Sequence, residues 1–511
     1  MCSHVRAKSE GLLDGSLVII TSLVVLASLA FLQYRSTPPF PVINVRKKDW
    51  TLSNGRNCFL TNAADLLLEG QRQTDGPFCI ITDRKTMTYL PPHYAEYIKN
   101  DRRFSFTEYA HRDMMGYLPG FDAFGSLLKS GILIEIVQKR LSPMIDKMSG
   151  ILSNTMDEAL QSQWSEETEF HEIPLHATVL AMVSRVTGRV FVGAELSNNP
   201  DWLRLSVTYT VNAFMASKEL GKYSWPVRWI VQWFNVRAQQ VRASLKEARQ
   251  ILTPILAQRA QERAANGGMS TTEDAIEWHQ QLVGDRKSDG VVVQVGLALS
   301  AIHTTGDLLF KTIGQLAHHQ EVIPAVRKEI ADAISTHGLN KTGVYHMQLL
   351  DSIIKETQRL DAVALAIMNR YATEEVELPN GVTIPKGSQT SVITDIMRSE
   401  KTYENAKEWD PYRFYNIRRS GQEQKGQLVS ATAEHFAFGF GKHACPGRFF
   451  AAHELKIMLA HILLKYDFEY IGTDRPKVRV VGTDVLADNS PRMQVRRRHD
   501  YVIPRATDET A

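Results

Sequence analysis

The feature that most constrains this chain is a glycine-rich loop at residues 436–450, FAFGFGKHACPGRFF, which runs into a helical pattern of apolar residues. Gly439 and Gly441 lack a Cβ, so the backbone there can turn sharply and lie against a flat ligand that side chains would hold off. The Pro-Gly pair after Cys445 is typical of a helix start. We therefore expect Cys445 to lie just before the N-terminus of a helix.

The surroundings expected for Cys445 favour a metal-bound thiolate. Backbone N–H groups and the helix dipole at a helix N-terminus favour the thiolate and can donate to the sulfur. A thiolate held in this way is a good ligand for haem iron. The alternative is a buried cysteine in a glycine turn, which is the usual state of a lone cysteine.

The loop matches a longer signature, F-x-x-G-x-[HR]-x-C-x-G, at Phe438, Gly441, His443, Cys445 and Gly447. On these residues the chain resembles the cytochrome P-450 superfamily, the haem-thiolate monooxygenases. The resemblance implies a mainly α fold with small β-sheets, and Cys445 as the axial ligand of the iron of haem b. It also implies that Gly439 and the other signature residues, including His443, surround this cofactor.

A second feature is the stretch from Val291 to His319, the longest apolar helical pattern in the body of the chain. A helix that is apolar on most sides is expected to be buried in a large core. Its middle, Ser300-Ala-Ile-His-Thr-Thr-Gly306, resembles the oxygen-binding segment of the same superfamily. The resemblance makes Thr304 the residue that orders water for protonation, and it places His303 where an acidic residue is usual. Mid-helix threonines are also common without any function.

The segment from Leu350 to Leu360 predicts a helix with Glu356 and Arg359 one turn apart. Such pairs are common and weak when exposed. In the resembled superfamily the pair is buried and is completed by an arginine of a later segment, which is Arg413 here. A buried pair of this kind persists only when its charges and hydrogen-bonding groups are matched, which a second arginine helps to achieve.

Arg370 precedes a predicted hairpin at residues 376–387, where Asn380-Gly381 is expected to supply positive φ angles. Two interpretations of Arg370 remain open: a surface strand residue, or a partner of a haem propionate. His443 is a further candidate for a propionate or reductase contact. A solvated helix face is the favoured interpretation of Lys139 and Arg140.

Elsewhere the patterns predict a small sheet between residues 50 and 94, and a long loop at 104–124 that lines a binding site. Helices are expected at 131–160, with a kink at Pro143, and from Pro324 onward. Helical patterns also cover the ranges 175–192, 202–216 and 227–265. A strand and loop at 481–491 is expected to close the substrate pocket.

Composition excludes several classes of function. The 511 residues are 43% hydrophobic, which is ample for a large core, and the net charge of +3 gives no reason to expect a nucleic-acid partner. The four cysteines form no C-x-x-C pair, so disulfides and a structural zinc site are not expected, and a reducing compartment is favoured.

The N-terminal region predicts a membrane anchor. Residues 16–32 are apolar and uncharged, and as a helix they reach about 25 Å, close to the thickness of a hydrocarbon core. A cleaved signal peptide and a buried helix are the alternatives. We expect an N-terminal segment at 1–15, a single transmembrane helix at 16–32, a proline-rich and basic linker at 33–49, and one catalytic domain at 50–511. The predicted location is the endoplasmic reticulum membrane, with the catalytic domain in the cytosol.

No flavin or nicotinamide domain is evident, so the resemblance implies electrons from NADPH through a separate NADPH-cytochrome P-450 reductase. The expected reaction is oxidation of a lipophilic small molecule. Residues 301–305 and 436–451 look closest to fungal secondary-metabolism members such as ent-kaurene oxidase-like and indole-diterpene oxidases, which favours a terpenoid substrate. A haem-thiolate isomerase or dehydratase and a non-enzymatic haem sensor are the alternative functions.

Overall fold

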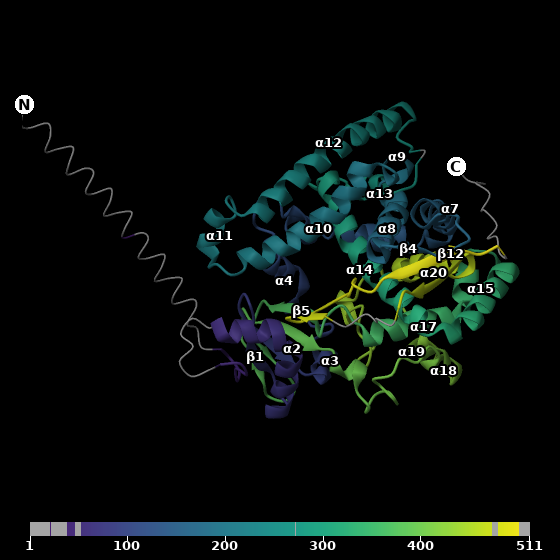
Figure 1. Ribbon diagram of the computed structural model, residues 1–511. Helices are drawn as coiled ribbons and strands as arrows, with labels where there is room; N and C mark the ends of the chain where they lie inside the picture. Colours follow the sequence, from purple (N-terminus) through teal and green to yellow (C-terminus); the bar gives the residue numbers. More distant parts are fainter. Residues whose placement is uncertain (1–20, 22–37, 46–52, 271, 473–478, 500–511) are drawn as a thin grey trace, which may run out of the picture.

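The computed structural model describes residue 21 and residues 38–45, 53–270, 272–472 and 479–499. Helices make up most of this part, and a sheet with a few short strands packs at one end of it (Figure 1). This arrangement confirms the expected mainly α fold with small sheets. The predicted transmembrane helix at 16–32 lies outside the described residues, apart from Thr21.

The principal sheet has five strands in the order β1-β2-β8-β5-β3. Neighbouring strands are antiparallel except for the parallel pair β2 and β8. The strands are β1 (Phe78–Ile81), β2 (Thr86–Leu90), β3 (Phe104–Ser105), β5 (Ala366–Ala372) and β8 (Gln389–Ile393). Val42 pairs with Cys79 of β1, and the side chain of Asn44 donates to the carbonyl oxygens of Gly55 and Ile81, so this part of the predicted linker packs on the sheet.

Smaller sheets complete the β-structure. One joins β4 (His171–Ile173), β12 (Met493–Arg497) and β9 (Tyr466–Tyr470). Two hairpins pair β6 (Val376–Glu377) with β7 (Thr383–Ile384), and β10 (Arg479–Val481) with β11 (Asp484–Leu486). In the β6–β7 turn only Gly381 has a positive φ (+76°), so the expectation that Asn380 shares this conformation is wrong.

Most of the long helices agree with the apolar periodicity, but two expectations are wrong in part. Residues 53–73, in the range 50–94 where a small sheet is expected, form a helix, and the helical pattern at 227–265 is broken at residues 232–235. The long helices are α2 (Ser53–Gln73), α7 (Ile145–Trp164), α8 (Leu175–Phe191), α10 (Pro200–Leu220), α12 (Val236–Ala265), α14 (Gly290–His318), α15 (Ile323–His337), α17 (Gln348–Leu360) and α20 (Arg448–Lys465). The shorter ones include α4 (Phe106–Asp113), α6 (Ile132–Ile136), α11 (Trp225–Val231), α16 (Lys341–His346) and α18 (Arg413–Arg419). A π-helical turn at Val137–Leu141 precedes the break at Pro143, where a kink is expected.

The loop predicted at 104–124 is wrong over its first part, because α4 occupies residues 106–113. The Ser105 side chain accepts a hydrogen bond from the backbone N–H of Glu108, at 3.1 Å, and so caps the helix. Glu108 in turn pairs with Arg112 one turn later. These local interactions form a helix without a long apolar period, because a capping residue satisfies an N–H group that the first turn leaves unpaired.

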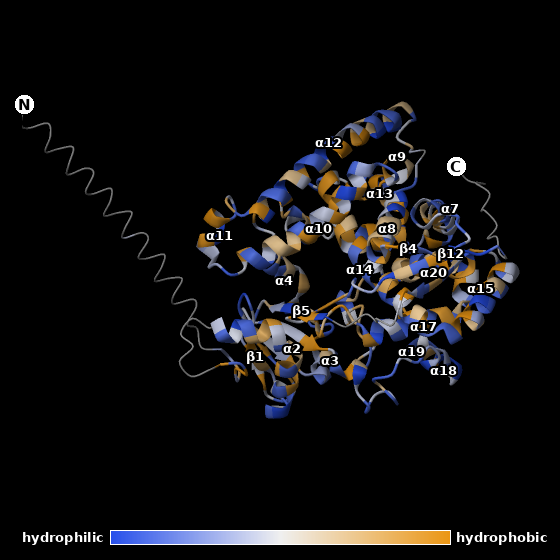
Figure 2. Ribbon diagram, in the orientation of Figure 1, coloured by the Kyte–Doolittle hydropathy of each residue, from blue (hydrophilic) through white to orange (hydrophobic). Residues whose placement is uncertain are grey.

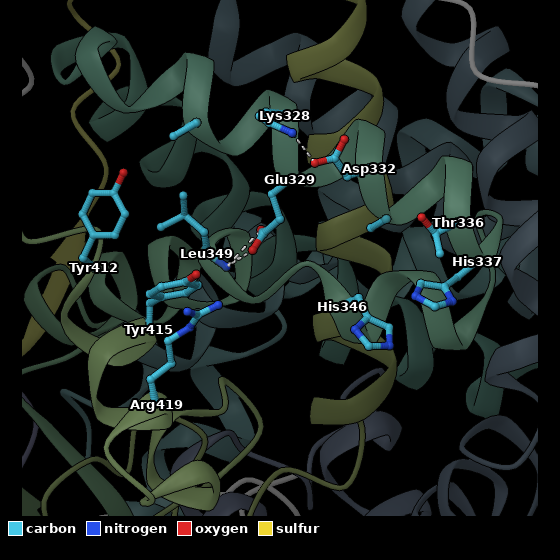
Figure 3. Close-up of a pocket in the computed structure, with 12 residues that line it drawn as sticks. Lys328, Glu329, Asp332, Thr336, His337, His346, Leu349, Tyr412, Tyr415 and Arg419 are labelled. Carbon is cyan, nitrogen blue, oxygen red and sulfur yellow. Dashed lines mark hydrogen bonds and ion pairs between the residues drawn. The ribbon is translucent and has the colours of Figure 1, made fainter.

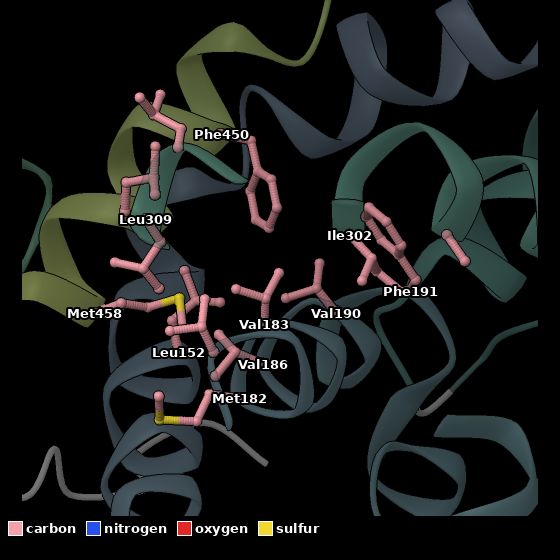
Figure 4. Packing of buried hydrophobic residues seen from close by; sticks show 14 of the residues in the cluster. Leu152, Met182, Val183, Val186, Val190, Phe191, Ile302, Leu309, Phe450 and Met458 are labelled. Carbon is pink, nitrogen blue, oxygen red and sulfur yellow. The ribbon is translucent and has the colours of Figure 1, made fainter. Parts of the chain in front are cut away.

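The core surrounds α14, which packs on α8, α10, α17 and α20. Figure 4 shows side chains of α7, α8, α14 and α20 interlocking, with Phe191 facing Phe450 at a ring-centroid distance of 6.0 Å. In the described part of the chain, α14 is the one helix long and apolar enough to span a membrane, and 67% of its most apolar window is buried in the protein. Its hydrophobicity is therefore that of a core helix.

The interface between α7 and α20 contains two buried histidines whose titration is expected to govern acid stability. His453 bonds Ser149 at 2.8 Å, and His461 bonds Ser153 at 2.9 Å. Burial, with nearby Lys456 and Lys465, lowers the pKa of each imidazole to about 3. Both imidazoles are therefore neutral in the folded chain at neutral pH.

We expect the free energy of unfolding to fall as the pH drops below about 6.5, because the unfolded chain then binds protons that the folded chain excludes. Each histidine contributes roughly 1.4 kcal/mol per pH unit between the unfolded and folded pKa values. Urea unfolding of wild type and of the His453→Gln/His461→Gln double variant at pH 7.5, 6.0 and 5.0 measures this. Glutamine can still bond the serines but does not titrate, so the double variant should lose less stability in acid; equal losses would contradict the prediction.

Candidate active site

The cysteine loop has the conformation that its glycines predict. Gly439 and Gly441 both have φ near +73°, and a Cβ on Gly441 would lie 2.3 Å from the carbonyl oxygen of Lys99. The backbone N–H of Cys445 donates to the carbonyl oxygen of Phe438 at 2.7 Å, which closes the turn. The loop is thus pressed against the segment that follows the first strands of the sheet.

Cys445 lies directly before α20, whose N-cap is Gly447. The backbone N–H groups of Gly447 and Arg448 donate to the sulfur, and the Arg448 side chain holds the Cys445 carbonyl at 2.9 Å. Burial nevertheless raises the pKa of the Cys445 thiol above its ordinary value, because it outweighs these donors. The helix N-terminus alone therefore does not make Cys445 a thiolate; a coordinated cation would supply the missing stabilisation.

Two basic side chains near the loop have buried nitrogen atoms without partners among the described residues. Arg370, on β5, is 2% exposed; it donates from Nη1 to the carbonyl oxygen of Asn369, while its Nε and Nη2 have no partner among the described residues. Nε2 of His443 is likewise buried and unpartnered in the described part of the chain. Burial lowers the pKa of Arg370 to about 10, and burial and Arg370 lower that of His443 to about 4.

Unpartnered buried donors are costly, so the free Nε and Nη2 groups of the Arg370 guanidinium point to an anion that completes them. The propionates of haem are carboxylates and fit this requirement, while the glycine loop and Cys445 fit the flat ring and its iron. The surface-strand interpretation of Arg370 is wrong, since the side chain is buried. The solvated interpretation holds for exposed Lys139, which pairs with Glu135, but not for Arg140, whose buried Nε has no partner among the described residues.

On α14, the side chains of Ser300 and Thr304 are exposed although the helix runs through the core. The Thr304 hydroxyl donates to the carbonyl oxygen of Ser300 at 3.0 Å. His303 bonds the carbonyl oxygen of Val207 on α10 at 2.9 Å through Nε2. The two predicted residues therefore have different surroundings: His303 faces α10, and Thr304 faces open space.

Glu356, Arg359 and Arg413 form one buried cluster. Arg359 binds both carboxylate oxygens of Glu356, each at 2.8 Å, and Arg413 donates to Oε1 of Glu356 at 3.1 Å. The side chains of Glu356 and Arg359 have no exposed surface, and that of Arg413 is 9% exposed. Arg359 also donates to the carbonyl oxygens of Met397 and Ala406, so the cluster fixes the long segment that leads to the cysteine loop.

A separate surface pocket of about 520 Å³ lies between α15, α16 and α18 (Figure 3). Glu329 there accepts hydrogen bonds from the backbone N–H groups of Leu349 and Leu350, and His337 stacks on His346 at 4.3 Å. None of the predicted site residues lines this pocket. Its size alone therefore does not make it the reaction site.

We expect Arg370→Met to have opposite effects on the cofactor-free and the haem-loaded chain. Removing a buried, incompletely bonded guanidinium should raise the free energy of unfolding without haem by about 1 kcal/mol or more. Loss of a charge-assisted bond should weaken haem retention by roughly tenfold to a hundredfold. Denaturation of the cofactor-free protein and haem transfer to apomyoglobin measure the two effects. The control is Arg249→Met, because Arg249 is exposed and paired with Asp289. Lower stability of the cofactor-free Arg370→Met variant with unchanged haem retention would contradict this role of Arg370.

The loop, the buried guanidinium of Arg370 and the open face of α14 fit the requirements of a haem-thiolate site on a helical fold. Comparison with known proteins agrees with this class: the family model "Cytochrome P450" matches residues 136–495. The cytochrome P450 monooxygenase esdpI of Penicillium shearii is 38% identical over 89% of this chain and 91% of its own length. The cytochrome P450 monooxygenase adrA of Penicillium rubens is 35% identical over 95% of this chain and 97% of its own.

Among solved structures, a retinoic acid-bound cyanobacterial CYP120A1 shares the fold, with a TM-score of 0.65 over 91% of this chain and all of that one, at 17% identity. The chain therefore belongs to the cytochrome P450 family. Its similarity to fungal relatives confirms the predicted haem-dependent monooxygenase of the secondary-metabolism type. The family implies a haem cofactor, a redox partner and a lipophilic substrate.

Proposed function

We propose that this P450 inserts one oxygen atom from O2 into a terpenoid or related fungal secondary metabolite, using electrons from NADPH delivered by a membrane-bound cytochrome P-450 reductase. The observation that carries the proposal is the combination of Cys445, with two N–H groups on its sulfur, and the unpartnered nitrogens of Arg370 and His443. Haem held by these residues supplies the oxygen-activating chemistry.

The chain's own residues have separate tasks in this proposal. Arg370 would bind the carboxylates of the cofactor and neutralise their charge, whereas His443, whose pKa of about 4 leaves the imidazole neutral at neutral pH, would contact them through Nε2 without adding charge. Cys445 would hold the iron through its sulfur, and the N–H groups of Gly447 and Arg448 would stabilise that sulfur as a thiolate. Thr304, on the exposed face of α14, holds a water molecule by its hydroxyl and so supports proton delivery, while His303 positions α10 beside it.

The terpenoid class is supported by the resemblance of residues 301–305 and 436–451 to fungal terpenoid oxidases. The relatives esdpI, adrA and ptmU are all named cytochrome P450 monooxygenases of Penicillium species, which supports the reaction class. A test follows: microsomes with this chain and a fungal reductase should convert candidate terpenoids to products one oxygen heavier. Under ¹⁸O2 the added mass should be that of ¹⁸O; products without label, or formed without NADPH, would favour an isomerase or dehydratase.

We also propose the domain arrangement predicted from the sequence, with an anchor at 16–32 in the endoplasmic reticulum membrane and a cytosolic catalytic domain from residue 50. Large side chains exposed around α11 support a membrane beside the folded body. They are Tyr223, Trp225, Trp229, Ile230, Trp233, Phe234 and Val236, of which Phe234 is 78% exposed. Figure 2 shows this apolar colour at α11, and Figure 1 shows α11 on the same side of the view as β1 and α2. Tryptophan and tyrosine prefer the membrane interface.

We expect a Trp229→Ser/Ile230→Ser/Phe234→Ser variant of a chain lacking residues 1–37 to bind liposomes at least roughly tenfold more weakly than the same chain with an unchanged α11. Each of these substitutions removes apolar surface that the bilayer would bury. Flotation with phosphatidylcholine and phosphatidylserine vesicles measures the binding. Leu68, exposed on α2, gives the control Leu68→Ser; equal flotation of all three chains would contradict a membrane contact by α11.

A further inference from the structure

A second, more enclosed pocket of about 200 Å³ lies at the sheet end of the molecule. β5, the strand that carries Arg370, supplies Ala366 and Asn369 to its lining. Residues of α10 and of the β10–β11 turn close other sides. The pocket therefore shares a strand with the proposed haem-binding arginine.

One wall of this pocket is lined by Ala364, Ala366 and residues 482–484. These residues belong to two segments far apart in the sequence, residues 361–366 and 482–486. Leu365 donates from its N–H to the carbonyl oxygen of Thr483 at 2.8 Å, and Val485 to that of Val363 at 3.0 Å. The two segments therefore form one unit, which we call the paired wall. A Cβ on Gly482 would lie 2.7 Å from the Phe59 ring, so the wall also presses against α2.

Lys311 of α14 joins both halves of the paired wall to the central helix. Its side chain is 8% exposed, and Nζ lies 2.7 Å from Oδ2 of Asp307, 3.2 Å from the carbonyl oxygen of Asp361 and 3.4 Å from that of Val485. An ammonium group has three donors, and all three have acceptors here. A methionine of similar length would fill the space but make none of these bonds.

Lys311 lies seven residues after Thr304 on the same helix, which is about 10 Å along its axis. Both residues belong to one helix, so a shift of the paired wall relative to Lys311 also changes the distance between the paired wall and Thr304. On the opposite side, Lys218 of α10 forms an ion pair with Asp484, in the same wall. This pair is about 40% exposed, so the buried contact of Lys311 is the stronger constraint.

We propose that Lys311 is a positioning residue that sets the distance between the Thr304 face of α14 and the paired wall, and thereby decides how a bulky lipophilic substrate lies against the haem. The inference rests on the proposed function and adds a determinant of substrate position to it. Lys311 itself does not touch the reacting atoms; it acts through the carbonyl oxygens of Asp361 and Val485.

The test uses two azole probes on the haem-loaded full chain, read by the spectral shift that a nitrogen ligand causes. Clotrimazole is bulky and must contact the walls, whereas imidazole is small and reports only the immediate surroundings of the haem. We expect Lys311→Met to weaken clotrimazole binding about tenfold while imidazole binding stays within about twofold. Asp307→Asn, which keeps both carbonyl bonds of Lys311, should leave clotrimazole binding within about threefold of wild type.

The control is Lys328→Met, which removes an exposed lysine paired with Asp332 far from the wall and should change neither constant. The carbon monoxide band of the reduced protein checks that each variant is folded. If Lys311→Met does not fold, Lys311→Gln, which retains a single donor group, should show the same selective loss in smaller measure. Unchanged clotrimazole binding, or an equal loss for both probes, would overturn the proposal.

Azole binding requires no turnover, so this test is independent of the oxidation reaction. If wild type binds both azoles but yields no labelled product under ¹⁸O2, the proposed function fails while the role of Lys311 in shaping the pocket stands. If Lys311→Met binds both probes as wild type does while wild type makes product, the positioning role fails and the proposed function stands.

Discussion

Cys445→Ser is expected to abolish the carbon monoxide band of the reduced protein at its thiolate position and to lower product formation at least about a hundredfold. Substitutions beside a metal ligand typically cost tenfold to a hundredfold, and loss of the ligand itself should cost more. Serine keeps the size of the side chain but offers no thiolate to the iron. The measurement is a reduced difference spectrum, together with product yield under saturating NADPH and reductase.

Cys58 provides a matched control, because it is another free cysteine, partly buried on α2. Cys58→Ser should keep both the band and the activity. Haem content must be measured in each variant, since Cys445→Ser could retain haem through Arg370 and His443. A thiolate band that survives in Cys445→Ser would show that Cys445 is not the ligand.

Much of the fold followed from periodicity and from the residues that interrupt it. The buried α14 was predictable because an apolar pattern of that length has few other uses in a globular chain. Its lysine at 311 was not, because only the fold shows which carbonyl groups meet a buried ammonium. α4 was missed because its stability comes from the Ser105 cap and an ion pair of one turn, signals too short for a periodicity search.

The sequence predicted which residues make up the candidate site, but not their pKa values or their hydrogen-bond partners. The signature located Cys445, yet the sequence suggested a helix N-terminus that favours the thiolate, whereas burial raises the pKa of the thiol. Whether the nitrogens of Arg370 and His443 have hydrogen-bond partners depends on which backbone groups lie within reach, and only the packed structure shows this. Arg140 was missed for the same reason.

The second large effect is expected at the buried cluster. Glu356→Gln should lower the free energy of unfolding by about 3–5 kcal/mol, because it leaves the two buried guanidinium groups without their shared carboxylate. Glutamine has nearly the same size, so the loss measures charge and hydrogen bonding rather than a cavity. Thermal or urea unfolding of the haem-loaded protein gives the value.

Arg413→Met separates the two arginines of the cluster. Arg413 makes one bond to Glu356, at 3.1 Å, whereas Arg359 makes two, so Arg413→Met should cost less than Arg359→Met. The exposed pair Lys328–Asp332 gives the control Asp332→Asn, which should cost less than about 1 kcal/mol. A loss of that size for Glu356→Gln would mean that the buried carboxylate contributes no more than a surface one.

The cluster holds the segment before the cysteine loop through Met397 and Ala406. A large loss of unfolding free energy in Glu356→Gln should therefore also lower haem retention, whereas a mere weakening of α17 would leave haem retention unchanged.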